Sequence, residues 1–286
     1  MSVDLVGRRT DYWFYAAENP ADAPTLVMIH GYRGNHHGLE AMAGAMTDVN
    51  VIIPDLPGFG SSQSFVEEHS IERYAKWVGD FVSALGARGE IVPSRITLLG
   101  HSFGTIVVSC AVAEGFAKPA RVVLINPVSA PALSGPRSVL TKLSSAYYWA
   151  GGHLPERAGT ALMSSPAIVR GMSILLAKTK DKAMRRWIHR EHDENFNNFE
   201  NQRVAYEGYI ASISHNVGEY AEKISQPTLL IIGEFDDITS VANQHAVQKK
   251  FANAQLEQID SIGHLTHYEA PVLAARFIRD FIENNR

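Results

Sequence analysis

The chain has 286 residues, of which 45% are hydrophobic and 20% are charged, and this composition excludes a disordered or fibrous protein. Its 26 basic residues against 30 acidic ones give a formal charge of -4, so no broad positive charge is available to bind nucleic acid. The sequence contains one cysteine, Cys110, which excludes an intramolecular disulfide and a cysteine-based metal cluster and is compatible with a reducing compartment.

The N-terminal segment predicts a cytoplasmic protein. Residues 1–20 mix charged and aromatic side chains and lack the apolar core that a secretory signal needs. No window of the sequence reaches the roughly 18 uninterrupted apolar residues of a membrane-spanning helix. We therefore expect no export by this route and no membrane span.

Short apolar runs predict the strands of a mostly parallel sheet. The runs are continuous rather than alternating, as expected for strands that are covered on both faces. They lie at 25–29, 49–53, 96–99, 121–125, 228–232 and 256–259. Segments around 4–6 and 12–16 predict an antiparallel hairpin at the sheet edge. Turn residues follow the runs, and the ends of parallel strands are where open α/β sheets bind ligands.

The strand pattern stops between Asn126 and Thr228, where the sequence becomes typical of helices. We predict a helical insertion over 129–220 in a core domain formed by 1–128 and 221–286. The length of the chain fits one large α/β domain that carries such an insertion.

The segment around Ser102 predicts a nucleophile elbow. Gly100-His101-Ser102-Phe103-Gly104 follows a predicted strand and precedes a predicted helix. A serine in so sharp a turn brings the residues two positions away against the backbone, so glycine is needed at 100 and 104. The hydroxyl then stands clear of the sheet at a helix N-terminus, where free amides and the helix dipole favour negative charge.

This segment resembles the nucleophile elbow of the α/β-hydrolase superfamily, and other motifs of that family follow in its order along nearly the whole chain. The resemblance implies a mostly parallel central sheet with helices on both faces and a helical cap over 129–220. His30-Gly31 is similar to the family's turn after an early strand, which implies that the backbone amides of Tyr32 and Phe103 form the oxyanion hole. Residues 54–62 resemble the family's Asp-x-x-Gly-x-Gly-x-Ser loop, and we interpret Asp55 there as structural.

Two further motifs identify an acid and a base by the same resemblance. Gly233-Glu234-Phe235-Asp236 is similar to the family's Gly-x-x-Asp pattern and favours Asp236 as the acid. The adjacent Asp237 stays an alternative. If it is not the acid, we expect it to be a solvated loop carboxylate. Residues 263–271 resemble its Gly-His-x-x-x-x-Glu-x-Pro signature and make His264 the expected general base. The order Ser102, Asp236, His264 is the nucleophile, acid, base order of this fold. His267 is expected to be a polar helix residue.

The predicted function is that of a serine hydrolase that cleaves an ester of a small to medium, mostly apolar acid without a cofactor. A serine needs an imidazole to take its proton and a carboxylate to orient that imidazole. One alternative is a carbon-carbon bond hydrolase of the meta-cleavage type, although Thr105 stands where that subgroup usually has a second glycine. Its carboxylate-binding arginine would have to be Arg185, Arg186 or Arg190. Another alternative is a ligand-binding relative with slow turnover.

The remaining histidine pairs give no metal prediction. His36 with His37, and His189 with His192, have no acidic or cysteine partner at a recognised metal-ligand spacing. We expect solvated or helix-capping histidines and no metal. The expected partner is a small-molecule substrate, and the oligomeric state is left open.

Overall fold

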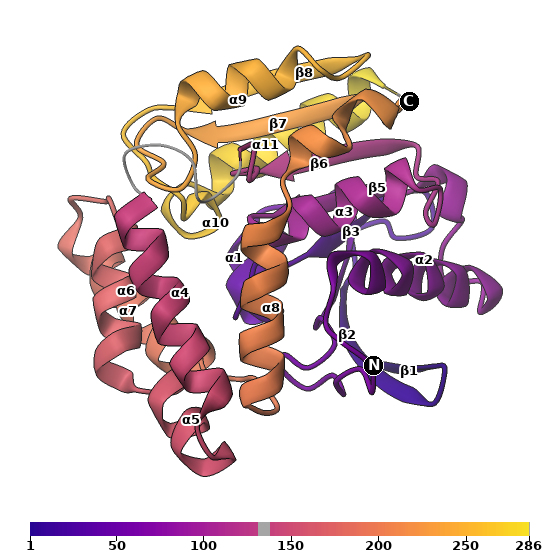
Figure 1. Ribbon diagram of the computed structural model, residues 1–286. Coiled ribbons are helices and arrows are strands. Elements are labelled where there is room, and N and C mark those ends of the chain that lie inside the picture. Colours follow the sequence, from indigo (N-terminus) through magenta and orange to yellow (C-terminus); the bar gives the residue numbers. More distant parts are fainter. Residues whose placement is uncertain (131–137, 286) are drawn as a thin grey trace.

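The computed structural model describes residues 1–130 and 138–285, and an eight-stranded sheet forms its centre (Figure 1). The strand order is β1-β2-β4-β3-β5-β6-β7-β8. The strands are β1 (Ser2–Leu5), β2 (Arg8–Tyr15), β3 (Thr25–Ile29), β4 (Asn50–Pro54), β5 (Thr97–His101), β6 (Arg121–Ile125), β7 (Thr228–Gly233) and β8 (Ala254–Ile259). The pairs β1–β2 and β2–β4 are antiparallel and the other pairs are parallel, which confirms the predicted fold class and edge hairpin.

Helices cover both faces of the sheet because alternate strand residues point to opposite sides. Val27 and Ile29 belong to one hydrophobic core, which packs under α2 and α3, and Leu26 and Met28 belong to the other, which packs under α1 and α11. The core helices are α1 (His37–Gly44), α2 (Ile71–Ala87), α3 (Phe103–Ala113), α9 (Val241–Gln248), α10 (Thr266–Glu269) and α11 (Pro271–Asn284), with short 3-10 turns η1 (Pro93–Arg95), η2 (Val217–Glu219) and η3 (Ala221–Lys223).

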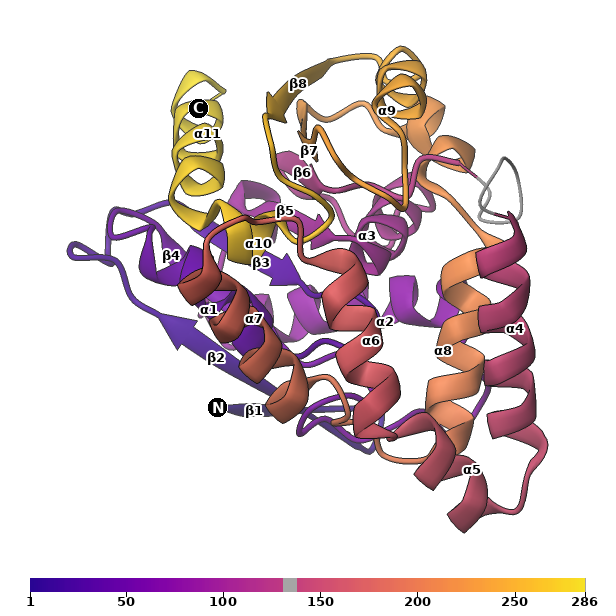
Figure 2. The same cartoon turned by 90° about the vertical axis from the view of Figure 1, so that its left-hand side faces the viewer.

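Among the described residues, five α-helices lie between β6 and β7, within the segment predicted as the cap. They are α4 (Ser138–His153), α5 (Glu156–Met163), α6 (Pro166–Leu176), α7 (Lys182–Asn195) and α8 (Gln202–Ser214). Figures 1 and 2 show α4 to α7 beside the core at the edge where the parallel strands end. The helical content agrees with the insertion, while the domain boundaries remain predictions.

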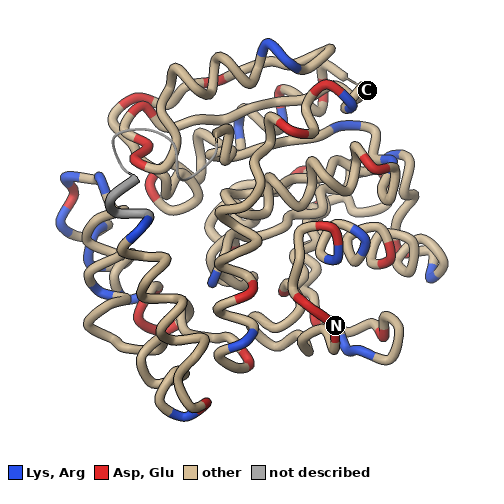
Figure 3. The backbone as a smooth tube through the Cα atoms, viewed as in Figure 1, with Lys and Arg blue, Asp and Glu red and all other residues tan. Residues whose placement is uncertain are grey.

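The stretch Glu156–Leu176 is long and apolar enough, by length and composition alone, to cross a membrane, and 22% of its most apolar window is buried. Ser164 and Ser165 divide it into α5 and α6, which are separate helices. Figure 3 shows basic and acidic positions distributed over both the core and the cap. The predicted lack of a membrane span and of a nucleic-acid partner both stay predictions.

Candidate active site

Ser102 occupies a strained turn between β5 and α3. Its backbone has φ 52° and ψ -118°, a conformation that residues with a side chain rarely adopt. A Cβ on Gly100 would lie 2.3 Å from the carbonyl oxygen of Gly104, and a Cβ on Gly104 would lie 2.3 Å from that of Ile29. The backbone is therefore packed too closely for any side chain at either position, which is the steric reason the sequence predicted an elbow here.

Three side chains from distant parts of the chain form one hydrogen-bonded series. The hydroxyl Oγ of Ser102 lies 2.7 Å from Nε2 of His264, and Nδ1 of His264 lies 2.9 Å from Oδ2 of Asp236. His264 and Asp236 are buried, while Ser102 is partly exposed. The structure thus brings the predicted serine, histidine and aspartate together in the predicted order.

Asp236, rather than Asp237, makes the contact with the imidazole. Oδ1 of Asp236 accepts hydrogen bonds from the amides of Ile238 at 2.8 Å and Thr239 at 3.2 Å. Burial by itself would raise the pKa of Asp236, but the neighbouring His264 and these two amides outweigh it and hold the pKa below its ordinary value. The carboxylate therefore stays ionised at neutral pH. Asp237 is ion-paired with Lys178 instead of being simply solvated.

Asn126 is a site residue that the sequence did not reveal. It follows β6 with φ 47°, and its Nδ2 donates to Oδ2 of Asp236 at 3.0 Å and to the carbonyl of Gly263 at 3.2 Å. The amide thus joins the aspartate to the loop that carries His264. Asparagine tolerates this left-handed conformation better than most residues, and its place at the end of a strand was the available signal.

The two predicted oxyanion residues both lie beside Ser102. Phe103 is the first residue of α3, where backbone amides have no acceptor within the helix. A Cβ on Gly31 would be 3.2 Å from the Cβ of Ser102, so the turn that contains Tyr32 packs directly against the serine. The rings of Tyr32 and Phe103 are 6.3 Å apart, edge to face.

The turn that contains Tyr32 is also bound to the cap. The Tyr32 hydroxyl donates to the carbonyl of Ala205 in α8 at 2.5 Å. Next to it, Arg33 has φ 61° and a fully buried side chain. Its guanidinium donates to the carbonyls of Phe196 at 3.1 Å and Met163 at 2.9 Å, and it also bonds Tyr148 and Asn197. No sequence motif indicates this arginine, which connects the oxyanion turn to three parts of the cap.

We expect Arg33→Met to destabilise the protein by about 2–4 kcal/mol, because several buried acceptors would lose their donor at once. Denaturant unfolding measures the change. Arg276→Met is the matched control, since the Arg276 side chain is 64% exposed and its loss should change stability by less than about 0.5 kcal/mol. Equal effects of the two variants would show that the buried arginine does not hold the cap.

Hydrogen bonds of Glu269 also connect the cap to the loop that carries His264. Its Oε1 accepts hydrogen bonds from the amides of Lys178 and Thr179, each at 2.6 Å, between α6 and α7. Its Oε2 accepts one from the amide of Gly263 at 2.9 Å. One buried carboxylate therefore links the cap to the residue that precedes His264.

The other histidines near the site are buried, which corrects two expectations. His267, expected as a polar helix residue, lies buried in α10 with its ring 4.0 Å from that of His101. His189 and His192, expected to be solvated or capping, are buried in α7 and both contact the Ser173 hydroxyl, at 2.6 and 2.8 Å. Tertiary packing between α6, α7 and α10 covers these faces.

Acid should destabilise the protein through these histidines. Burial lowers the pKa of His101 to about 3 and that of His192 to about 4, against about 6.5 in an unfolded chain. Between those values the unfolded chain binds protons that the native protein does not, so the free energy of unfolding falls as pH decreases. The free energy of unfolding therefore has its full value above about pH 6.5. Below that pH each of these histidines lowers it by about 1.4 kcal/mol per pH unit.

Urea unfolding at about pH 7 and pH 5.5 measures this pH dependence. His192→Gln should reduce it, and His153→Gln, which changes an exposed histidine of α4, should not. A free energy of unfolding that is constant over this range would contradict the prediction.

The cap arginines considered for an alternative chemistry lie on the surface. Arg185, Arg186 and Arg190 are all exposed on α7, and Arg185 donates to the carbonyl of Thr179. The buried arginine of the site is instead Arg33.

Comparison with known proteins identifies the family. The model of the alpha/beta hydrolase family matches residues 26–277, which is most of the chain. The chain therefore belongs to the alpha/beta hydrolase family. This membership confirms the resemblance stated from the motifs, and with it the assignment as a hydrolase.

Two relatives and two solved structures are similar to the chain at 16–24% sequence identity. Lipase 1 of Psychrobacter immobilis is 24% identical over 268 residues, covering 91% of this chain and 77% of that protein. Monoacylglycerol lipase ABHD6 of Homo sapiens is 22% identical over 274 residues, covering 92% and 76%. Among solved structures, a thermophilic esterase from Thermogutta terrifontis has a TM-score of 0.76 at 18% identity, covering 99% of this chain and 97% of that one. The enol-lactonase from Burkholderia xenovorans LB400 has a TM-score of 0.78 at 16% identity, covering 99% and 100%.

Proposed function

We propose that this hydrolase cleaves an ester of a small to medium, mostly apolar acid through a covalent acyl-enzyme. The observation that carries the proposal is the hydrogen-bonded series from the Ser102 hydroxyl through His264 to Asp236, placed at a strained elbow. These are the groups that make a serine nucleophilic: a base within 2.7 Å and a carboxylate that orients the base.

In the proposed reaction, Oγ of Ser102 attacks the ester carbonyl while Nε2 of His264 takes the hydroxyl proton. The imidazolium then gives this proton to the departing alcohol, and the acyl group stays on the serine. Water, deprotonated by the same imidazole, attacks the acyl-enzyme. The imidazolium then returns its proton to Oγ of Ser102 as the acid leaves. Asp236 holds Nδ1 of His264 protonated throughout and stabilises the imidazolium.

We assign the stabilisation of the two tetrahedral intermediates to the backbone amides of Tyr32 and Phe103. Two structural facts support this role: the position of Phe103 at the start of α3, and the contact between the Tyr32 turn and Ser102. One donor of this kind contributes about 10² to 10³ in rate. The rings of Tyr148 and Tyr209 pack against Tyr32, so aromatic side chains surround the oxyanion turn, and we take this as support for an apolar acyl group.

The choice of an ester over a carbon-carbon bond is supported by the relatives, several of which are named lipases or esterases. The arginines that a carbon-carbon hydrolase would need from the cap are exposed on α7, so no observation favours that alternative.

Labelling with a fluorophosphonate, followed by peptide mass spectrometry, tests the nucleophile directly. We expect one adduct, on the peptide that contains Ser102. Hydrolysis of p-nitrophenyl acetate, butyrate and octanoate then measures the acyl preference, which we expect to favour the shorter two. Folded protein with no adduct on Ser102 would refute the mechanism. An adduct together with a single stoichiometric burst, and no steady turnover, would identify a slow ligand-binding relative instead.

A further inference from the structure

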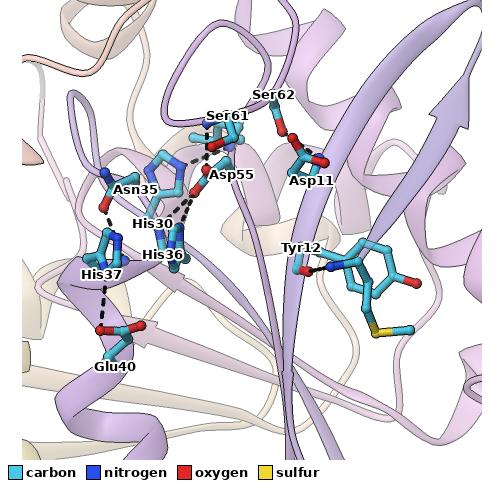
Figure 4. Close-up of polar contacts among 12 residues, drawn as sticks. Asp11, Tyr12, His30, Asn35, His36, His37, Glu40, Asp55, Ser61 and Ser62 are labelled. Carbon is cyan, nitrogen blue, oxygen red and sulfur yellow. Dashed lines mark hydrogen bonds and ion pairs between the residues drawn. The ribbon is translucent and has the colours of Figure 1, made fainter.

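His36, His37 and Glu40 form a cluster at the start of α1 that the proposed reaction does not use. One ligand atom from each of these residues lies within 4.8 Å of the others. Figure 4 shows the His36 and His37 rings side by side, with the Glu40 carboxylate next to His37. The sequence has no acidic residue at a recognised metal-ligand spacing from this histidine pair, but in the structure Glu40 lies one helical turn after His37 and supplies a carboxylate.

We propose that these three residues bind a divalent transition-metal ion, with zinc as the best match. Two imidazole nitrogens and a carboxylate oxygen are a donor set that zinc uses in proteins, and a water molecule would complete a tetrahedral site. Nδ1 of His37 and Oε2 of Glu40 are 3.1 Å apart, close to the roughly 3.3 Å between two tetrahedral zinc ligands at about 2.05 Å.

The contacts of His36 leave one ring nitrogen for a metal ion. Its Nδ1 lies 3.0 Å from Oδ1 of Asp55 and its ring stacks on Trp13, so Nε2 is the nitrogen available to a metal. A carboxylate behind the histidine is the usual outer partner of metal-binding imidazoles, because it sets the tautomer and the direction of the ring. The side chain is 6% exposed, so this ligand has little freedom to move.

Glu40 has an outer partner of the same kind, since the Tyr15 hydroxyl donates to its Oε1 at 2.9 Å and leaves Oε2 for the metal. The side chains of His37 and Glu40 are each 43% exposed. They can therefore rotate toward the fixed His36 and close the remaining distance. The open side also leaves a route for the ion and for its water ligand.

Asp55 adds an electrostatic reason for a cation here. Its carboxylate is fully buried, and its described partners are the imidazole of His36 and the backbone amides of His36 and Ser61. No lysine or arginine is ion-paired with it among residues 1–130 and 138–285. A divalent ion on the opposite nitrogen of His36 would offset this buried negative charge through the imidazole. The same contacts support the structural role predicted for Asp55.

The site would stabilise the loop that carries Tyr32 rather than take part in ester hydrolysis. His36 and His37 lie where the segment that follows the oxyanion turn enters α1. A metal ion would tie this segment to β2 through Tyr15 and to the loop after β4 through Asp55. The expected readouts are therefore metal binding and thermal stability, which can be measured whether or not the protein hydrolyses esters.

Calorimetric titration of zinc into chelator-treated, tag-free protein tests the proposal. We expect one ion per chain. His37→Ala and Glu40→Gln should each lower the affinity for zinc at least about tenfold, because loss of a residue that only supports a metal ligand already costs about that much. His215→Ala is the matched control. His215 and Glu219 form a pair with Nδ1 and Oε2 2.9 Å apart and similar exposure, but no third ligand is grouped with them among the described residues. This control should bind zinc like the wild type.

Thermal unfolding gives the second measurement. Zinc should raise the unfolding temperature of the wild type and of His215→Ala, and should raise it much less in His37→Ala and Glu40→Gln. Glu40→Gln keeps the size of the side chain, so it answers the question even if His37→Ala folds poorly. The proposal is overturned if the wild type shows no saturable binding, or if the two ligand variants bind zinc as tightly as the control.

Discussion

Ser102→Ala should lower kcat/KM for a p-nitrophenyl ester by about 10⁴-fold or more. The substitution removes the oxygen that attacks the carbonyl and leaves the backbone of the elbow in place, because alanine is no larger than serine at this position. The remaining rate would come from the oxyanion amides and from binding, which act without the nucleophile.

Ser83→Ala is the control for this variant. Ser83 is exposed on α2, so its loss should leave kcat/KM within about twofold of wild type. Thermal unfolding should confirm that both variants are folded. If Ser102→Ala retained wild-type turnover of the ester, the covalent mechanism proposed for this serine would be wrong.

Asp236→Asn should lower kcat by about 10³ to 10⁴-fold while changing KM little. The amides of Ile238 and Thr239 need an acceptor at Oδ1, so the asparagine would keep its oxygen there. Its NH₂ group would then face Nδ1 of His264 and donate to it. This forces the proton onto Nε2, and an imidazole protonated at Nε2 cannot accept the proton of Ser102.

Asp237→Asn, measured in the same assay, shows which of the two neighbouring carboxylates acts as the acid. It removes the partner of Lys178 in a pair whose side chains are 26% and 30% exposed, and pairs of this kind contribute about 1 kcal/mol or less to stability. We expect kcat within about threefold of wild type. A larger loss in Asp237→Asn than in Asp236→Asn would transfer the role of the acid to Asp237.

The sequence predicted those parts of the fold and the site that depend only on residues close together in the chain. The continuous apolar runs predicted β3 and β5 to β7 within two residues at each end, because a strand buried on both faces must be apolar throughout. The elbow was predictable because the crowding around Gly100 and Gly104 arises within a few residues. The turn of the edge hairpin was placed slightly late, since Val6 and Gly7 form it.

Contacts between distant elements escaped prediction because they depend on where other residues lie. Nothing near Asn126 in the sequence shows that its amide bonds Asp236, 110 residues away. The burial of His267 also follows from packing between elements, and its own helix is only four residues long.

The sequence by itself determined the family, the sheet and the residues expected to carry the chemistry, because each has a motif set by local sterics or by the period of the strands. Only the tertiary structure decided which groups support them: Arg33 and Glu269 at the cap, Asn126 behind the aspartate, and Asp55 behind His36. A buried polar or charged group binds the groups that the fold brings within about 3 Å of it, and these can be far away in the sequence.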